Sequence, residues 1–179
     1  MKPKIKMFIK LFALSNLILL SSAMNINIIN NCPWLIDIYS HEVINGKPQF
    51  TNKCKIQNKK SCLLKFPDNK VESGLIKDLN GEKATLFEFT KNKDGIWYDI
   101  SVIPPGSGNC NSYDECYQKS KKTGFNDPLR VGVKTLKKNS RCTNLTCLDK
   151  KCPDAYLYPY DDTKTHFCHL NTNFTLTYC

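Results

Sequence analysis

Histidine is scarce in this 179-residue chain, which holds three: His41, His166 and His169. None lies near a plausible nucleophile motif, and the chain has no Gly-x-Ser-x-Gly elbow, so a serine-hydrolase site is excluded. The GSGN stretch at 106–109 lacks the flanking strand and helix of a phosphate-binding loop. The His166–His169 segment has metal-like spacing, but we expect Cys168 to be oxidised and so not a ligand. The sequence predicts no metal and no cofactor.

Long apolar runs are also scarce, and the one that stands out extends from Leu11 to Leu20. Four lysines precede it and small residues follow, which predicts a secretory signal peptide at residues 1–23, cleaved after Ala23. The run is too short to span a bilayer. Because the leader holds four lysines and no acid, its removal lowers the formal charge from +10 to +6. We therefore expect a secreted, extracellular monomer without a transmembrane span. Its charge favours anionic surfaces, and we expect no nucleic-acid partner.

No segment has the apolar spacing of an amphipathic helix of three turns, and no internal repeat is present. Residues 112–122 are polar enough to form only a single helical turn or a loop. Alternating apolar segments, separated by Gly, Pro, Asn and Asp turns, are typical of strands instead. These segments are 25–39, 61–67, 73–79, 85–90, 95–103 and 173–179. In the last, Phe174, Leu176 and Tyr178 share one side. The pattern predicts an all-β sandwich or barrel in one domain.

All ten cysteines lie after the predicted leader. An even count in a small exported chain predicts a disulfide framework, although spacing alone does not select the pairing. A bridge from Cys32 to Cys179 would close nearly the whole domain and contribute up to roughly 4–5 kcal/mol in the chain-entropy model. Two sequons, at Asn144 and Asn173, either mark a glycoprotein or arise by chance in an asparagine-rich chain.

The segments on either side of KNKDG form a predicted hairpin. Asp94-Gly95 is a strong signal for a two-residue turn. With that turn, Asp99 lies diagonally from Glu88 on the same face, where Cβ atoms are about 7–8 Å apart or somewhat less. Two carboxylates so placed raise each other's pKa where water is restricted. A three-residue loop would instead put them on opposite faces.

The C-terminal run CPDAYLYPYDDTKTHFC at 152–168, followed by NFTLTYC, resembles the end of thaumatin-like proteins. Those proteins close with a Cys-Pro-Asp-Ala-Tyr-x-Tyr-Pro-x-Asp-Asp segment, a further cysteine and a last strand ending in Cys. Three other stretches resemble the family in order and spacing: NINIINNCPWLIDIY, TLFEF with WYDIS, and GFNDPLRV. The resemblance covers most of residues 25–179, and the C-terminal motif is the specific one.

The resemblance implies a disulfide-stapled antiparallel β-sandwich at residues 24–179, of the small ten-cysteine type among the pathogenesis-related and osmotin-like proteins. Most of the family's second, disulfide-rich domain is lacking, because only LDKK stands between Cys147 and Cys152. A basic loop at 104–124 is inserted relative to the family. By analogy, the implied disulfides are Cys32–Cys179, Cys142–Cys168 and Cys147–Cys152, with Cys54–Cys62 and Cys110–Cys116 left as local loops.

The resemblance also implies an acidic cleft, which in the family is lined by one arginine, one glutamate and three aspartates. Glu88 and Asp99 match the glutamate and the first aspartate, and Asp161 or Asp162 matches the last. The arginine falls on Leu75, and the remaining aspartate falls near the inserted loop, so two of the five positions are lost.

Other side chains extend this candidate cleft. Lys77 or Lys83 would have to supply the missing positive charge. The tyrosines Tyr156, Tyr158 and Tyr160 either pack in the core and turns or stack on sugar faces. With one side of the cleft shortened, we expect its carboxylates to be exposed and to keep ordinary pKa values.

Three functions are compatible with these residues. The resemblance implies a secreted carbohydrate-binding or host-defence protein, antifungal through β-glucan binding at a reduced acidic cleft. The second is a weak β-1,3-glucanase with Glu88 as acid and Asp99 as second carboxylate, which the shortened cleft disfavours. The third is a secreted effector or inhibitor with an idle cleft, which contacts an extracellular protein through the inserted loop.

Overall fold

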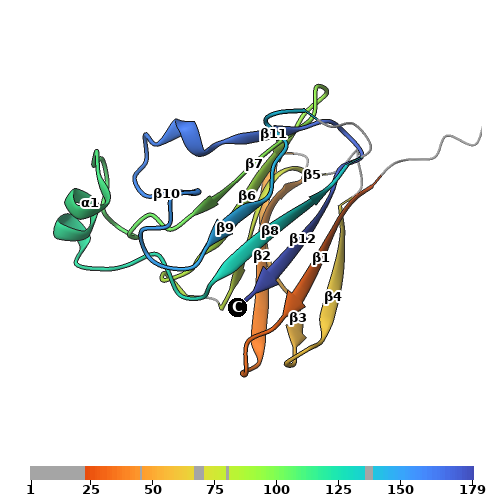
Figure 1. The fold of residues 1–179 in the computed structure, drawn as a ribbon, viewed down its shortest axis with the longest axis horizontal. Helices are drawn as coiled ribbons and strands as arrows, with labels where there is room; N and C mark the ends of the chain where they lie inside the picture. Colours follow the sequence, from red (N-terminus) through yellow and green to blue (C-terminus); the bar gives the residue numbers. More distant parts are fainter. Residues whose placement is uncertain (1–22, 45, 67–70, 80, 136–138) are drawn as a thin grey trace, which may run out of the picture.

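The computed structural model describes residues 23–44, 46–66, 71–79, 81–135 and 139–179. Within them the chain forms two β-sheets packed against each other, with helix α1 to one side (Figure 1). The all-β class predicted from the sequence is confirmed. The predicted signal peptide lies outside the described residues, apart from Ala23. No helix in the described ranges is long and apolar enough to cross a membrane.

The first sheet has five strands in the order β4-β1-β12-β8-β9. The central strand β12 pairs in parallel with β1, and the other neighbours pair antiparallel. Its strands are β1 (Met24–Asn30), β4 (Ser61–Phe66), β8 (Leu129–Lys134), β9 (Leu145–Cys147) and β12 (Asn173–Tyr178).

The second sheet has seven strands, in the order β10-β7-β6-β5-β2-β3 with β11 also paired to β7. β10 and β11 occupy successive parts of the same edge of β7. Its strands are β2 (Ile36–Ile44), β3 (Lys47–Ile56), β5 (Val71–Asp78), β6 (Leu86–Lys91), β7 (Ile96–Ser101), β10 (Ala155–Tyr156) and β11 (His166–Cys168). A short 3₁₀ helix, η1 (Asp162–Lys164), connects β10 to β11.

The core lies between the sheets and is built from alternate residues of each strand. Along β12 the pattern buries Phe174, Leu176 and Tyr178 and leaves the intervening residues half-buried, as predicted. Phe87 of β6 lies 5.3 Å from the ring of Phe174, so aromatic packing joins the two sheets. Each such side chain contributes roughly 1.5–3 kcal/mol through burial.

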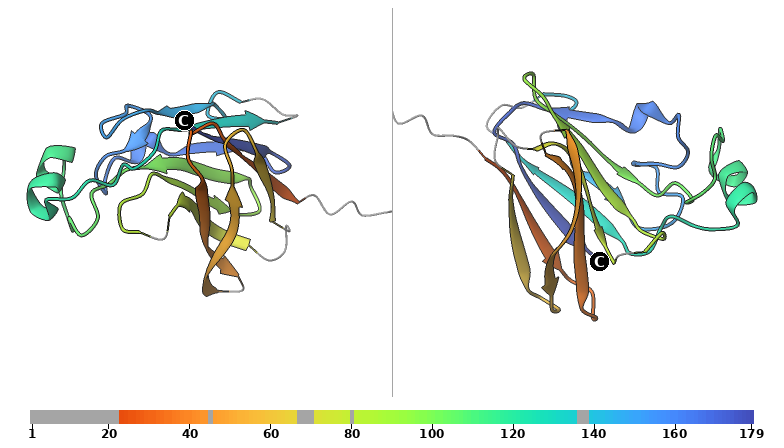
Figure 2. Two further views of the ribbon diagram at one scale, coloured as in Figure 1. Left: turned by 90° about the horizontal axis from the view of Figure 1, so that it is seen from below. Right: turned by 180° about the vertical axis from the view of Figure 1, so that it is seen from behind.

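Helix α1 (Tyr113–Ser120) corrects the prediction of a single turn or a loop at this place. Ser112 caps its start by accepting a hydrogen bond from the Glu115 amide at 3.2 Å. Glu115 in turn forms an ion pair of 2.7 Å with Lys119, one turn later. Figure 2 shows α1 standing clear of both sheets. Local capping and pairing therefore stabilise a helix that has little apolar burial.

The hairpin between β6 and β7 corrects the predicted register. Glu88 lies directly opposite Asp99, not diagonally from it. Residues 92–95 form the turn between the two strands, and the Asn92 amide donates to the Gly95 carbonyl across it at 3.0 Å. The Asn92 side chain also accepts from the amides of Asp94 and Gly95, at 2.9 and 3.1 Å. The observed register between the two strands differs from the predicted one by two residues. This difference keeps both carboxyls on one face of the sheet and brings them closer together.

Five disulfides join the described cysteines: the three pairs that the family resemblance implies and the two local loops that it leaves over. They are Cys32–Cys179, Cys54–Cys62, Cys110–Cys116, Cys142–Cys168 and Cys147–Cys152. The first links the end of β1 to the end of the chain. Cys142–Cys168 ties β11 to the connection between β8 and β9. The edge of the second sheet beside β7 is thereby fixed covalently.

Gly124 packs tightly against the backbone that follows β7. A Cβ atom there would lie 2.4 Å from the Ile103 carbonyl oxygen and 2.6 Å from the Val102 backbone. We expect Gly124→Ala to lower the free energy of unfolding by about 1–3 kcal/mol, as overpacking usually does. Urea unfolding measures the change. Gly132→Ala, whose Cβ would meet Thr175 at 3.7 Å, is the control, and an equal loss in both variants would contradict this reason.

Candidate functional site

A pocket of about 440 Å³ opens on the face of the second sheet that points away from the core. Its floor is formed by β2, β5, β6 and β7, and a residue of the β10–β11 connection borders it. The lining residues are His41, Val43, Ser73, Gly74, Leu75, Glu88, Phe89, Thr90, Trp97, Asp99 and Thr165. We call this the cleft pocket. It contains Glu88 and Asp99, the two carboxyls on which the sequence interpretation depends.

One row of side chains crosses the floor from strand to strand. Leu75 pairs with His41 on one side and with Glu88 on the other, and Glu88 pairs with Asp99. Directly opposed residues have Cβ atoms about 4.5–5.5 Å apart. The row therefore places an imidazole, an apolar side chain and two adjacent carboxyls in line. This order follows from the alternation of each strand and the register between strands.

Burial dominates the electrostatics of the two carboxyls. It raises the pKa of Asp99 to about 8, with the neighbouring charge of Glu88 as a second cause. The pKa of Glu88 is also raised by burial, against a hydrogen bond with Ser101 that lowers it. The Oδ1 atom of Asp99 is buried without a hydrogen-bond partner. The expectation of exposed carboxylates with ordinary pKa values is wrong, because the sheet floor itself withdraws them from water.

The opposite wall connects to the YPYDD segment through Tyr156. The Tyr156 hydroxyl contacts the Thr165 hydroxyl and donates to Asp162 at 3.3 Å. Burial raises the pKa of Tyr156, and the charges of Asp99 and Asp162 raise it further. Asp162 is thus coupled to the cleft pocket without lining it. Thr165 lines the pocket, with Tyr156 behind it, because β10 and β11 dock on β7, which strand periodicity does not reveal.

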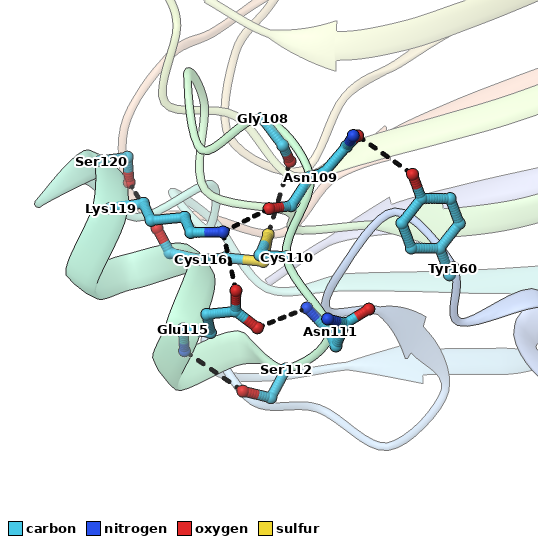
Figure 3. Close-up of polar contacts among 10 residues, drawn as sticks. All are labelled: Gly108, Asn109, Cys110, Asn111, Ser112, Glu115, Cys116, Lys119, Ser120 and Tyr160. Atoms are coloured by element: carbon cyan, nitrogen blue, oxygen red, sulfur yellow. Dashed lines mark hydrogen bonds and ion pairs between the residues drawn. A yellow bond between two sulfur atoms is a disulfide. The ribbon is translucent and has the colours of Figure 1, made fainter.

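The remaining predicted cleft residues lie outside the pocket lining. Asp161 is buried beside η1, where it accepts a hydrogen bond from the Thr163 hydroxyl at 3.3 Å. Tyr158 is partly buried, and its carbonyl accepts from the Asp161 amide. Tyr160 is exposed and donates to the Asn109 side chain at 3.0 Å, so it is directed at the inserted loop (Figure 3).

The positive charge of the family cleft has no direct replacement among the lysines considered. Lys77 donates to the Gly81 carbonyl and lies over the ring of Phe50. Lys83 borders a different pocket. Two other basic residues lie at this pocket: His41 lines it beside Leu75, and the Arg141 guanidinium stacks 4.5 Å from the ring of Trp97. Sequence reasoning missed both, because only the strand order brings His41 next to Leu75.

Metal binding finds little support in the described part of the chain. The one group of three potential ligands there is Cys32, Asp127 and Cys179. Both sulfurs are joined in a disulfide, so they are not available as thiolate ligands.

The predicted sequons lie on the first sheet and its loops. Asn144 is exposed, and its side-chain oxygen accepts from the Val133 amide at 2.9 Å. Asn173 is partly buried and accepts from the Asn25 amide at 2.9 Å. The prediction of glycosylation at these positions stays a prediction.

Comparisons with known proteins agree with this fold. No family model matches the chain. A thaumatin-like pathogenesis-related protein 4 of Avena sativa is 30% identical over 176 residues, which cover 89% of each chain. A thaumatin-like protein of Oryza sativa is 34% identical over 102 residues, but the match spans 56% of this chain and only 44% of the rice protein.

Two solved structures share the architecture. The protein elicitor MoHrip2 from Magnaporthe oryzae has a TM-score of 0.55 at 13% identity, covering 88% of this chain and 99% of its own. The thaumatin-like xylanase inhibitor TLXI has a TM-score of 0.53 at 14% identity, covering 86% of this chain and 98% of its own. At this level of identity the likeness concerns the fold alone.

Proposed function

This chain belongs to the thaumatin-like protein family, and from that premise we propose that it is a secreted host-defence protein that binds cell-wall β-glucan at the cleft pocket. Antifungal activity would follow from that binding. The observation that carries the proposal is the pair Glu88 and Asp99 beside the ring of Trp97 in one open pocket. The curated relatives named pathogenesis-related support the defence role.

The chemistry of the pocket suits a neutral sugar. With its pKa raised to about 8, Asp99 holds a proton at neutral pH and donates a hydrogen bond. Glu88, next to it, accepts one when ionised. Trp97 offers a flat apolar face to the C–H face of a pyranose, with Arg141 stacked against the indole. Sugar hydroxyls both donate and accept hydrogen bonds, so two adjacent carboxyls, one of them a donor, complement them.

Binding is favoured over hydrolysis by the same geometry. A glycosidase needs an acid and a second carboxylate on opposite sides of the scissile bond. Glu88 and Asp99 stand on one face of one sheet, and both approach a ligand from the same side. A weak β-1,3-glucanase is accordingly the less favoured function of this pocket.

Retention on insoluble β-glucan at high salt tests the proposal, with chitin and cellulose as comparison matrices. We expect Glu88→Gln with Asp99→Asn to lower affinity about tenfold or more, because a hydrogen bond to a charged group contributes about 1.5–3 kcal/mol. The matched control is Asp114→Asn with Glu115→Gln, the same two chemical changes on α1. Equal retention of both double variants would contradict glucan binding in the cleft pocket.

A second candidate function is binding of an extracellular protein through the inserted loop. The loop is firmly organised: Lys119 donates to the Asn109 carbonyl, and Glu115 accepts from the Asn111 amide at 2.8 Å (Figure 3). The Tyr160 contact and the Lys151–Asp114 ion pair of 2.7 Å tie it to the C-terminal segment. A prearranged, protruding loop suits protein recognition. Loss of activity on removing residues 106–122, with glucan retention unchanged, would favour this function.

A further inference from the structure

A second pocket, of about 480 Å³, lies at the end of the sandwich where β5 finishes and β6 begins. It shares no lining residue with the cleft pocket. Its residues come from three separate segments: the β1–β2 connection, the end of β5 with the following turn, and the approach to β8. They are Trp34, Leu35, Asp78, Leu79, Gly81, Glu82, Lys83, Asn126 and Asp127. We call it the Trp34 pocket.

Two carboxyl groups form its base. Asp78 is 2% exposed and Asp127 is 7% exposed, and the two carboxyls lie close enough together to influence each other's pKa. Burial raises the pKa of Asp78 to about 6, and the charge of Asp127 raises it too, although Asp78 accepts from the Asp37 amide at 2.6 Å. Both carboxyls therefore form the polar base of the pocket.

A third polar group lies buried beside this pair. The Tyr178 hydroxyl is fully buried and has no hydrogen-bond partner among the described residues. Both Asp78 and Asp127 lie close enough for their charges to raise the pKa of Tyr178. Burying a hydroxyl without a partner is costly. Tyr178 does not line the pocket, but it adds a third buried polar group next to the two carboxyls.

The rim has the opposite character. Trp34 is 51% exposed, and Leu35 and Leu79 are similarly exposed. Large apolar side chains gathered over a polar base are typical of a ligand pocket rather than of a plain surface. The indole face can cover the C–H face of a pyranose while carboxyls below take its hydroxyls. We propose that the Trp34 pocket is a second saccharide-binding site, with Trp34 as the stacking platform and Asp78 and Asp127 as the hydroxyl-binding pair.

A divalent cation fits this place less well than a sugar. Calcium takes six to eight oxygen ligands, whereas the base offers two carboxyl groups. The third acid at the rim, Glu82, forms an ion pair with Lys122 at 2.5 Å. Lys83 lies close enough to Asp127 for its charge to lower the pKa of that carboxyl, and it would repel a metal ion. A neutral ligand with several hydroxyl groups needs no such number of oxygen ligands and is not repelled by Lys83.

The tryptophans make the two pockets separately observable. The chain has two, and Trp34 lines one pocket while Trp97 lines the other. In Trp97→Phe, tryptophan emission reports on the Trp34 pocket alone. In Trp34→Phe, it reports on the cleft pocket. A titration with laminarihexaose, cellohexaose, xylohexaose and chitohexaose at pH 5 therefore tests each site without the other, and failure of glucan binding in the cleft leaves this inference untouched.

We expect one of the four oligosaccharides to change the emission of Trp97→Phe in a saturable way. Adding Asp127→Asn should weaken that binding about tenfold, while adding Asp94→Asn, the same change on an exposed turn, should leave it unaltered. Circular dichroism establishes that each variant is folded. Emission that no probe alters, or equal binding by the Asp127→Asn and Asp94→Asn proteins, would overturn the proposal. A response to calcium alone would also overturn it, in favour of a cation site.

Discussion

Replacing Cys32 and Cys179 together by alanine is expected to lower the free energy of unfolding by about 5 kcal/mol in the chain-entropy model. The bridge joins residues 147 positions apart, so it constrains almost the whole unfolded chain. It also links the end of β1 to the end of the chain after β12. These two strands pair in parallel in the first sheet. Urea unfolding without reductant measures the loss.

The Cys147–Cys152 bridge provides the control, because only five positions separate its cysteines. The same model gives about 2 kcal/mol for removing it. Both bridges are buried at each end or nearly so, so alanine replacement removes comparable packing from each. If the two double variants lost equal stability, loop closure would not be the main contribution of the long bridge.

The long strands could be predicted from the sequence because their periodicity is strong. In β1 and β12 every second residue is buried, and an apolar residue at nearly every buried position makes that visible without a structure. The short strands β9, β10 and β11 have two or three residues each. No period can be read over that length, and these strands exist because tertiary contacts with β7 and β8 provide their partners.

The sequence contains a pattern that predicts the start of helix α1 without reference to apolar spacing. Ser112 and Glu115 form the Ser-x-x-Glu pattern of a capping box, and the Ser112 side chain accepts from the Glu115 amide. The helix is polar because it covers no core. Methods that look for an apolar stripe therefore assign it to loop, whereas the cap pattern marks its first turn.

The cleft pocket was partly predictable. Glu88 and Asp99 share a face because both lie on strands of one hairpin, and either an exact pairing or a shift of two residues preserves that face. The register itself was not predictable from Asp94-Gly95. Gly95 does not adopt the positive φ of a type I′ turn, and the Asn92 side chain organises a turn over residues 92–95 instead. His41 depends on strand order across the sheet, which a single sequence does not contain.

Asp99→Asn is expected to stabilise the protein, and increasingly so as pH rises. The unfolded carboxyl has a pKa of about 3.9, whereas burial raises that of folded Asp99 to about 8. Between these values the folded state holds a proton that the unfolded state has released, so wild-type stability falls as pH rises from about 4 to 8. Asparagine cannot ionise and escapes this loss.

The gain should be near zero at pH 4 and about 2–4 kcal/mol at pH 8, below the roughly 5 kcal/mol that the full shift implies, because Glu88 shares the effect. Urea unfolding at pH 4, 6 and 8 measures it, with Asp94→Asn as the exposed control. If the free energy of unfolding changed with pH equally in Asp99→Asn and wild type, ionisation of Asp99 would not be what lowers the stability of the wild type. A more stable variant that no longer retains β-glucan would mean that Asp99 is kept at a cost to the fold, as is usual for residues selected for binding.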